Sequence, residues 1–98
     1  MTHFPIERMV TRAWLHSLER MSGDVLMNKT QIRQRSVNLY KALSLTYSNR
    51  GEVIFWIENG EYCMPLRSRA LALGDRSVFL EHNIRIPINN ICNIQFLS

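Results

Sequence analysis

The 98-residue chain has few of the residues that build specialised frameworks, with two cysteines, three prolines and four glycines. Its longest uninterrupted apolar run covers residues 53–57, far shorter than the ~20 residues that a membrane-spanning helix needs. The first residues lack the apolar stretch and the cleavage site of an export signal. These absences predict a cytoplasmic protein with no membrane segment.

The two cysteines, Cys63 and Cys92, are far apart in the chain, with no C-x-x-C motif and no histidine at ligand spacing. Both lie in apolar, strand-like segments, so we expect buried free thiols, with a disulfide between them as the alternative. The sequence also contains no glycine-rich phosphate loop and no nucleophile motif. We therefore predict no metal, no cofactor and no enzymatic activity.

The composition is that of a globular protein, with 46% apolar and 20% charged residues, and the length predicts a single domain over residues 1–98. The net charge of +4 is unevenly distributed. No acidic residue occurs between Asp24 and Glu52, whereas five basic residues do: Lys29, Arg33, Arg35, Lys41 and Arg50. This segment predicts a surface that binds nucleic acid or an acidic protein.

Apolar residues at three- and four-residue spacing predict helices over residues 5–21 and 29–45, which form a helical part at 5–45. Gly23 follows the first helix as a left-handed cap residue. Asn28 caps the second, with Gln31 at the capping-box position. The pair of helices also loosely fits a helix-turn-helix arrangement.

After residue 51 the apolar pattern changes to the two-residue period of strands. Asn59-Gly60 predicts a type I′ hairpin turn, His82-Asn83 another tight turn, and Pro65 an edge or bulge position. We predict strands at 52–57, 61–66, 69–73, 77–81, 84–86 and 91–96, and a 3₁₀ turn at 87–90. The expected fold class is α+β, with N-terminal helices packed on a small, strongly bent antiparallel β barrel at 52–97.

The candidate binding residues lie on the second helix and on the first hairpin. Lys29, Arg33, Arg35 and Lys41 could neutralise phosphates, and three nearby amides could read base edges: Gln31, Gln34 and Asn38. The aromatic residues Trp56 and Tyr62 could stack on bases or contact a partner. The alternative interpretation is a solvated helix face and aromatic residues that belong to the core.

Four segments resemble one family: residues 38–43 (NLYKAL), 53–62 (VIFWIENGEY), 76–81 (RSVFLE) and 86–94 (IPINNICNI). Together they make residues 25–94 similar to the YolD-like family of bacterial and phage proteins. The resemblance implies an Sm-like or SH3-like barrel and a role linked to Y-family DNA polymerases in the SOS response. The chain departs from the family near its start, where members carry Arg-Gly-x-x-Lys-Trp and this chain has Arg12-Ala-Trp14 within a predicted helix.

These observations predict a non-catalytic interaction or regulatory adaptor. The expected partner is another protein, such as a DNA-repair polymerase or a phage factor. Direct binding of DNA or RNA through the basic second helix is the first alternative. A structural phage protein or a small dimerisation protein, forming a homo-oligomer, is the second alternative.

Overall fold

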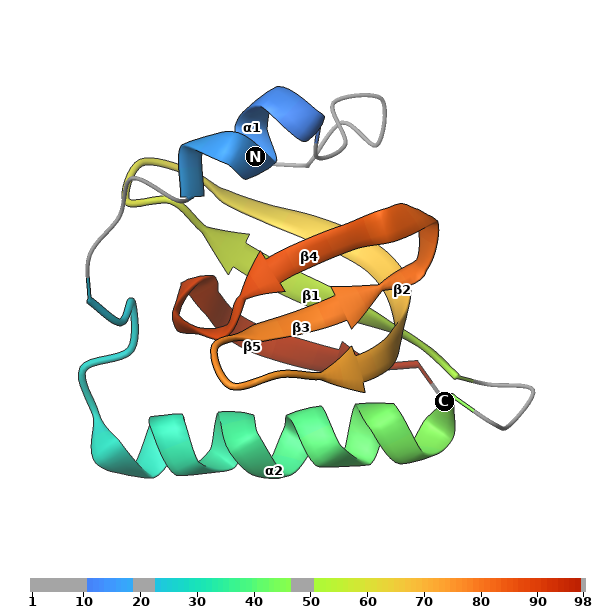
Figure 1. Ribbon diagram of the computed structural model, residues 1–98. Helices are drawn as coiled ribbons and strands as arrows, with labels where there is room; N and C mark the ends of the chain where they lie inside the picture. The colour runs from blue at the N-terminus through green and yellow to red at the C-terminus, as the bar shows by residue number, and fades with distance from the viewer. Residues whose placement is uncertain (1–10, 19–22, 47–50, 98) are drawn as a thin grey trace.

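The computed structural model describes residues 11–18, 23–46 and 51–97. Five antiparallel strands form one sheet in the order β4-β3-β2-β1-β5, and two helices pack against it (Figure 1). The elements are α1 (Arg12–Ser17), α2 (Lys29–Leu45), β1 (Glu52–Glu58), β2 (Cys63–Leu73), β3 (Ser77–Leu80), η3 (Glu81–Asn83), β4 (Ile84–Pro87), η4 (Ile88–Asn90) and β5 (Ile91–Phe96). The predicted α+β class is confirmed. In the described part of the chain, no helix combines the length and apolarity that a membrane crossing requires.

The second helix has the predicted boundaries, whereas the first is shorter than predicted. Asn28 starts α2 because its side-chain oxygen accepts hydrogen bonds from the backbone N–H groups of Thr30 and Gln31. The first helix begins at Arg12, because Thr11 is extended and its hydroxyl accepts a hydrogen bond from the N–H of Trp14 at 3.1 Å. A helix running through Thr11 is therefore wrong, and the rest of the predicted span, 5–10 and 19–21, lies outside the described residues.

The two predicted strands at 61–66 and 69–73 are one continuous strand, β2. Its first part pairs with β1, and its last part pairs with β3 from Ala70 onward. Ala70 and Ala72 pair with two consecutive residues of β3, Leu80 and Phe79, so Leu71 is an extra residue in β2. Such a bulge bends the strand. Pro65 pairs with Trp56 of β1, and the β2–β3 ladder begins only at Ala70, so β2 is an edge strand at Pro65, as predicted.

A closed barrel is not formed. The sheet ends at β4 on one side and at β5 on the other, with no ladder joining these two strands among the described residues. Strand β4 has four residues and ends at Pro87, which has no N–H to donate. The turn η4 then redirects the chain toward β1. The sheet is therefore bent, as predicted, but open.

The two predicted tight turns differ in outcome. His82 and Asn83 both have positive φ, 64° and 59°, as a type I′ turn requires. At the first hairpin Gly60 has a φ of 96°, but Asn59 does not adopt a positive φ, so the predicted type I′ turn is wrong. Instead the N–H of Asn59 donates to the carbonyl of Tyr62 at 3.1 Å, which closes a longer loop before β2.

The core lies between the bent sheet and the helices. Val53, Phe55 and Ile57 alternate along β1 and are fully buried, and each such side chain contributes about 1.5–3 kcal/mol through burial. Leu39 and Ala42 of α2 complete this core from below the sheet, whereas α1 lies above it (Figure 1). Because α1 and α2 lie at opposite ends of the bent sheet and do not pack on each other as a pair, the helix-turn-helix arrangement is not formed (Figure 1).

Candidate interaction surface

The four basic candidates of α2 lie in three different environments. Arg35 is buried, with 5% of its side chain exposed, and is paired with Asp24. Its Nη1 donates to a carboxylate oxygen of Asp24 at 2.8 Å and to the carbonyl of Ile91 at 3.0 Å. The hydrogen bond from Arg35 is the main reason that the pKa of Asp24 is lowered from its ordinary value. Arg35 therefore joins α2, the link before it and β5, and is not available to a ligand.

Lys41 is exposed but has a partner within the protein. Its Nζ lies over the ring of Phe96, 4.5 Å from the centroid, at the end of β5. Such a cation–π contact contributes about 0.5–1 kcal/mol at an exposed site. Lys41 therefore points toward the end of β5, and not toward a ligand placed beyond the outer face of α2.

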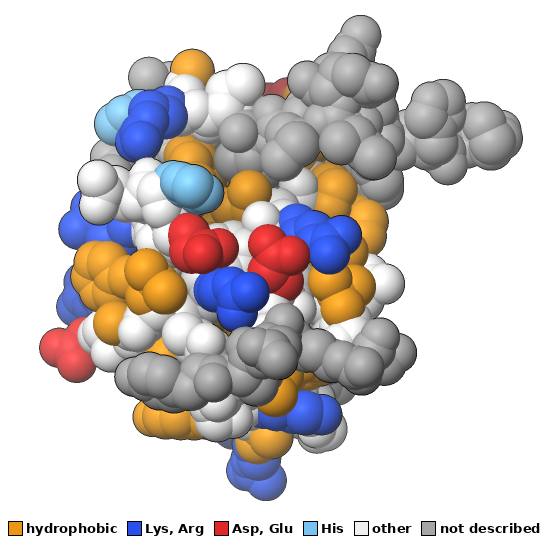
Figure 2. Space-filling view, turned by 90° about the vertical axis from the view of Figure 1, so that its right-hand side faces the viewer, with side chains coloured by type: hydrophobic (Ala, Val, Ile, Leu, Met, Phe, Trp, Pro, Cys, Tyr) orange, Lys and Arg blue, Asp and Glu red, His pale blue; other side chains and the backbone are white. Residues whose placement is uncertain are grey.

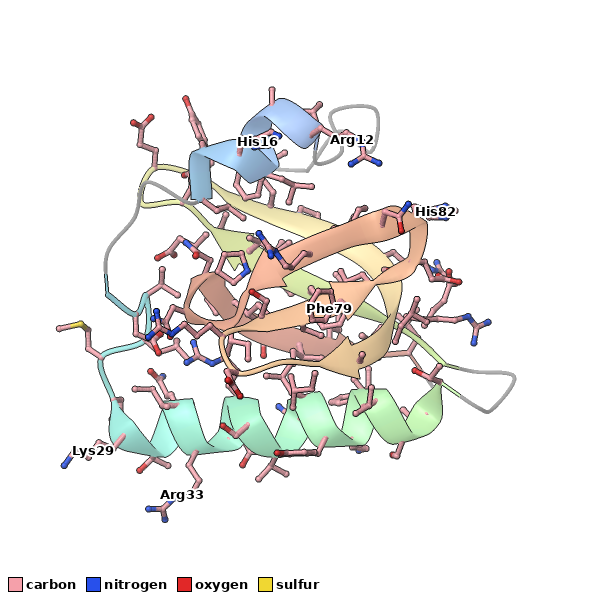
Figure 3. The ribbon with its side chains drawn as sticks, in the orientation of Figure 1. Arg12, His16, Lys29, Arg33, Phe79 and His82 are labelled. Atoms are coloured by element: carbon pink, nitrogen blue, oxygen red, sulfur yellow. The ribbon has the colours of Figure 1, made fainter. Side chains whose placement is uncertain are left out.

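The remaining two cations belong to one exposed row on α2, which we call the outer stripe: Lys29, Arg33, Val37 and Tyr40. Their spacing places all four side chains within one face of a helix with 100° per residue. Lys29 and Arg33 point away from the sheet (Figure 3). Val37 is 54% exposed and Tyr40 is 64% exposed. The stripe thus presents two cations beside two exposed apolar side chains.

The outer stripe has an electrostatic cost for the helix that carries it. The first turn of α2 contains no acidic residue. Lys29 lies there instead, next to the positive end of the helix dipole, which is unfavourable by a few tenths of a kcal/mol. The helix start, Lys29 and Arg33 together make a concentrated positive potential. This arrangement suits an acidic ligand better than it suits helix stability.

The predicted base-reading amides are on another face of α2. The side chain of Gln34 donates to that of Asn38 at 3.1 Å, so the two amides bind each other. Both line a small groove of about 150 Å³ against β5, together with Gln31 and Cys92. Cations and amides therefore face different directions, and one major groove could not contact both sets at once.

The structure does not bring the two aromatic candidates to the outer stripe. Trp56 is half-buried, and its Nε1 donates to the side chain of Gln95 at 3.1 Å. Tyr62 is exposed in the loop between β1 and β2, well separated from α2 (Figure 1). Trp56 is not among the buried core residues, so the alternative interpretation of a core aromatic residue does not hold for it, and Tyr62 is a separate exposed side chain.

A second surface was not predicted from the sequence. A groove of about 540 Å³ lies between α1 and the strands β2 to β4, lined by Arg12, His16, Leu71, Phe79 and Arg85 among others. Arg12 reaches the carbonyl of His82 at 3.3 Å, and Phe79 projects from β3 (Figure 3). The lining residues come from four separate segments, so no local pattern identifies them.

Charges are balanced on other parts of the surface. Arg67 pairs with Glu52 at 3.0 Å and Arg69 with Glu81 at 3.7 Å. Figure 2 shows basic and acidic side chains next to one another in the middle of one face. The outer stripe differs from these regions because α2 carries no acidic residue at all.

Comparisons with known proteins do not identify this surface. No protein-family model matches the chain, and no curated protein or solved structure matches it significantly. The function of this chain must therefore be inferred from its own residues and their geometry.

The two cysteines are brought together by the fold. Both thiols are free, and each is half-buried where burial was predicted. Their sulfur atoms are 3.4 Å apart, beside Glu58. The sequence alternative of a disulfide would also have paired these two cysteines, but the structure has free thiols in contact, and this contact depends on how β2 and β5 are placed around β1.

Proposed function

We propose that this chain is a non-catalytic binding module that docks on an acidic surface of another protein through the outer stripe of α2. The observation that carries the proposal is the exposure of Val37 and Tyr40 beside Lys29 and Arg33, on a helix without acidic residues. Exposed apolar side chains supply contact area, and the cations supply attraction and specificity toward acidic groups.

The resemblance to YolD-like proteins supports a particular choice of partner. It suggests a Y-family DNA polymerase or a phage factor as the first protein to test. We also propose that the bent, open sheet is a relative of the Sm-like or SH3-like barrels that the resemblance implies. Direct binding of DNA or RNA is the alternative. Two observations weigh against it: Arg35 is buried in an ion pair, and the amides of Gln34 and Asn38 bind each other on another face of the helix.

Removal of the apolar half of the stripe is expected to abolish docking. The double variant Val37→Ser/Tyr40→Ser removes exposed contact area and leaves the core intact, so the free energy of unfolding should change by less than about 0.5 kcal/mol per site. The matched control is Leu71→Ser/Phe79→Ser, which removes a pair that is 49% and 41% exposed in the groove beside α1. Affinity capture from the native host, quantified by mass spectrometry, compares wild type with both variants.

The proposal is supported if one set of proteins is retained by wild type and by the control, and is lost by Val37→Ser/Tyr40→Ser. Loss with the control variant alone would place docking at the groove beside α1 instead. Retention of every protein by both variants would contradict docking at either surface. A molar mass of twice the chain in solution, abolished by Val37→Ser/Tyr40→Ser, would show that the partner is a second copy.

Charge reversal at Lys29 and Arg33 should separate binding from stability. The variant Lys29→Glu/Arg33→Glu places acids near the positive end of the helix dipole, so the melting temperature should be unchanged or slightly higher. Binding of the acidic partner should nevertheless fall at least about tenfold, as expected for reversed charges at an electrostatically complementary interface. Thermal melts and a partner titration measure the two effects on the same samples.

The nucleic-acid alternative is tested with the same variant. Mixed-sequence duplex and single-stranded oligonucleotides are titrated at low and at high salt. If they bind wild type with strong salt dependence and fail to bind Lys29→Glu/Arg33→Glu, direct binding is correct and protein docking is wrong. The absence of oligonucleotide binding even at low salt would exclude that alternative.

A further inference from the structure

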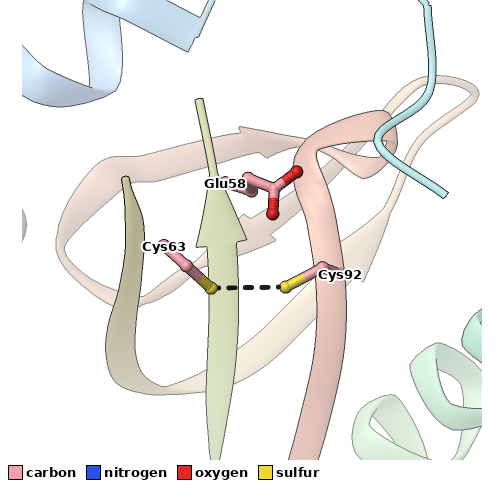
Figure 4. A group of neighbouring side chains, drawn as sticks. All are labelled: Glu58, Cys63 and Cys92. Atoms are coloured by element: carbon pink, nitrogen blue, oxygen red, sulfur yellow. Dashed lines mark hydrogen bonds between the residues drawn. The ribbon is translucent and has the colours of Figure 1, made fainter. Parts of the chain in front are cut away.

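Three groups that bind metals meet at the end of β1, away from the outer stripe. The Sγ atoms of Cys63 and Cys92 are 3.4 Å apart and point toward each other (Figure 4). A carboxylate oxygen of Glu58 lies within 4.8 Å of both sulfur atoms. All three side chains are half-buried, so they are fixed by their surroundings but still reachable from solvent.

The sheet positions these groups through a bulge. Cys63 in β2 is directly opposite Glu58 in β1. On the other side of β1, Trp56 pairs with Asn93 and Ile57 pairs with Ile91, which leaves Cys92 as an extra residue without a ladder partner. Bulges of this kind redirect a side chain. Here the sulfur of Cys92 approaches that of Cys63 across the intervening strand.

The distances fit a shared cation better than a disulfide. A disulfide needs the sulfurs about 2.05 Å apart and the Cα atoms roughly 4.4–6.8 Å apart. Strand β1 lies between β2 and β5, so the two cysteines are on strands that are not neighbours, and the bulge in β5 shortens the ideal separation of about 9–10 Å between such strands. A tetrahedral Zn²⁺ with Zn–S bonds of ~2.3 Å holds two sulfurs about 3.8 Å apart. The observed 3.4 Å is a hydrogen-bond contact between two thiols, and it is closer to the spacing in a metal site than to that of a disulfide, which would require the sulfur atoms to move together.

The groups in the cluster also suit a cation. The Glu58 carboxylate and the two cysteine sulfur atoms lie within 4.8 Å of one another. A divalent cation is stabilised by donors of this kind when they are deprotonated. Each cysteine sulfur would bind as a thiolate, so both thiols would release their protons to solvent.

We propose that Glu58, Cys63 and Cys92 form a binding site for a thiophilic divalent cation, with Zn²⁺ as the physiological ion. Two thiolates and one carboxylate are ligands that zinc accepts, and water completes four-coordination. The bound ion connects β2 to β5 across β1. This site replaces the expectation from the sequence that the two cysteines bind no metal, and it does not depend on the proposed docking function.

The site is tested by titrating the reduced, full-length protein with Co²⁺ and Cd²⁺ in the presence of a phosphine reductant. We expect one equivalent to bind, with sulfur-to-metal charge-transfer absorption in the near ultraviolet and release of about two protons, one from each thiol. Zn²⁺ should displace Co²⁺. Cys63→Ser and Cys92→Ser should each lose the charge-transfer absorption, and Glu58→Gln should weaken binding at least about tenfold.

The matched control is His16→Asn/His82→Asn, which removes exposed histidines outside the cluster and should leave the titration unchanged. A measurement on wild type alone adds an independent test, because Zn²⁺ should protect both cysteines from alkylation by iodoacetamide. The proposal is wrong if stoichiometric Co²⁺ and Cd²⁺ produce no charge-transfer absorption. It is also wrong if the two cysteines form a disulfide under mild oxidation while the reduced protein binds no metal.

Discussion

Replacement of Arg35 by methionine is expected to lower the free energy of unfolding by about 3 kcal/mol, the lower end of the range for breaking a buried ion pair. Methionine fills much of the same space but leaves Asp24, 21% exposed, without its cation. The carbonyl of Ile91 also loses its hydrogen bond from Arg35. For a domain of this size the melting temperature should fall by more than about 10 °C. Thermal and urea unfolding measure both quantities.

The matched control is Arg33→Met, the same substitution two residues earlier on the exposed face of α2. It should change the free energy of unfolding by less than about 0.5 kcal/mol, because Arg33 is exposed. Equal effects of the two substitutions would show that Arg35 does not have the structural role described above.

The same ion pair predicts how stability depends on pH. Because Arg35 lowers the pKa of Asp24 in the folded state, the pair contributes fully above the unfolded-state pKa, whose ordinary value is 3.8. This contribution is lost as the pH falls through the lower, folded-state pKa. The difference in unfolding free energy between wild type and Arg35→Met should therefore shrink on acidification below about pH 4. A difference that grows in acid would contradict the assignment.

Substitution of Gly51 by alanine is expected to cost about 2–3 kcal/mol, because α2 and β1 approach each other too closely there for a side chain. A Cβ at this position would lie 2.6 Å from the carbonyl oxygen of Leu45 and 2.5 Å from Nη1 of Arg69. The arginine can move, but the carbonyl belongs to the backbone of α2. The end of the helix would have to shift away from the sheet, and urea unfolding measures the cost.

Gly74→Ala is the comparison for this substitution. A Cβ at Gly74 would meet Cε2 of Phe79 at 3.2 Å, and this exposed side chain can move away. We expect a change below about 1 kcal/mol. If the two alanine variants lose the same free energy of unfolding, the close approach of α2 to β1 is not what excludes a side chain at residue 51.

Features encoded by neighbouring residues were predicted well from the sequence. Helix α2 has its predicted boundaries because Asn28 caps it through residues only two and three positions away. The turn at His82-Asn83 and strand β5 also match, since their signals are short. In contrast, the division of β2 into two strands was wrong, because its continuity depends on pairing with β1 and then β3.

The candidate site was predicted in part. The basic character of α2 is a property of its sequence, but the burial of Arg35 depends on Asp24, eleven positions earlier, and on Ile91, at the other end of the chain. The exposed positions of Val37 and Tyr40 follow from the side of α2 that packs on the sheet. The approach of Cys63 to Cys92 depends on a bulge in β5 that the sequence pattern does not predict.

The return of β5 to β1 determines the order in which the sheet can assemble. Strands β1 to β4 pair with neighbours in sequence, so each pair can form as a local hairpin. The β1–β5 ladder joins residues as far apart as Val53 and Phe96, and closing that long loop is slow. Until β5 docks, one edge of β1 has unpaired backbone groups beside Phe55 and Ile57, and such an edge invites aggregation. We therefore expect the yield of refolded protein to fall as protein concentration rises, because chains can aggregate before β5 has paired with β1.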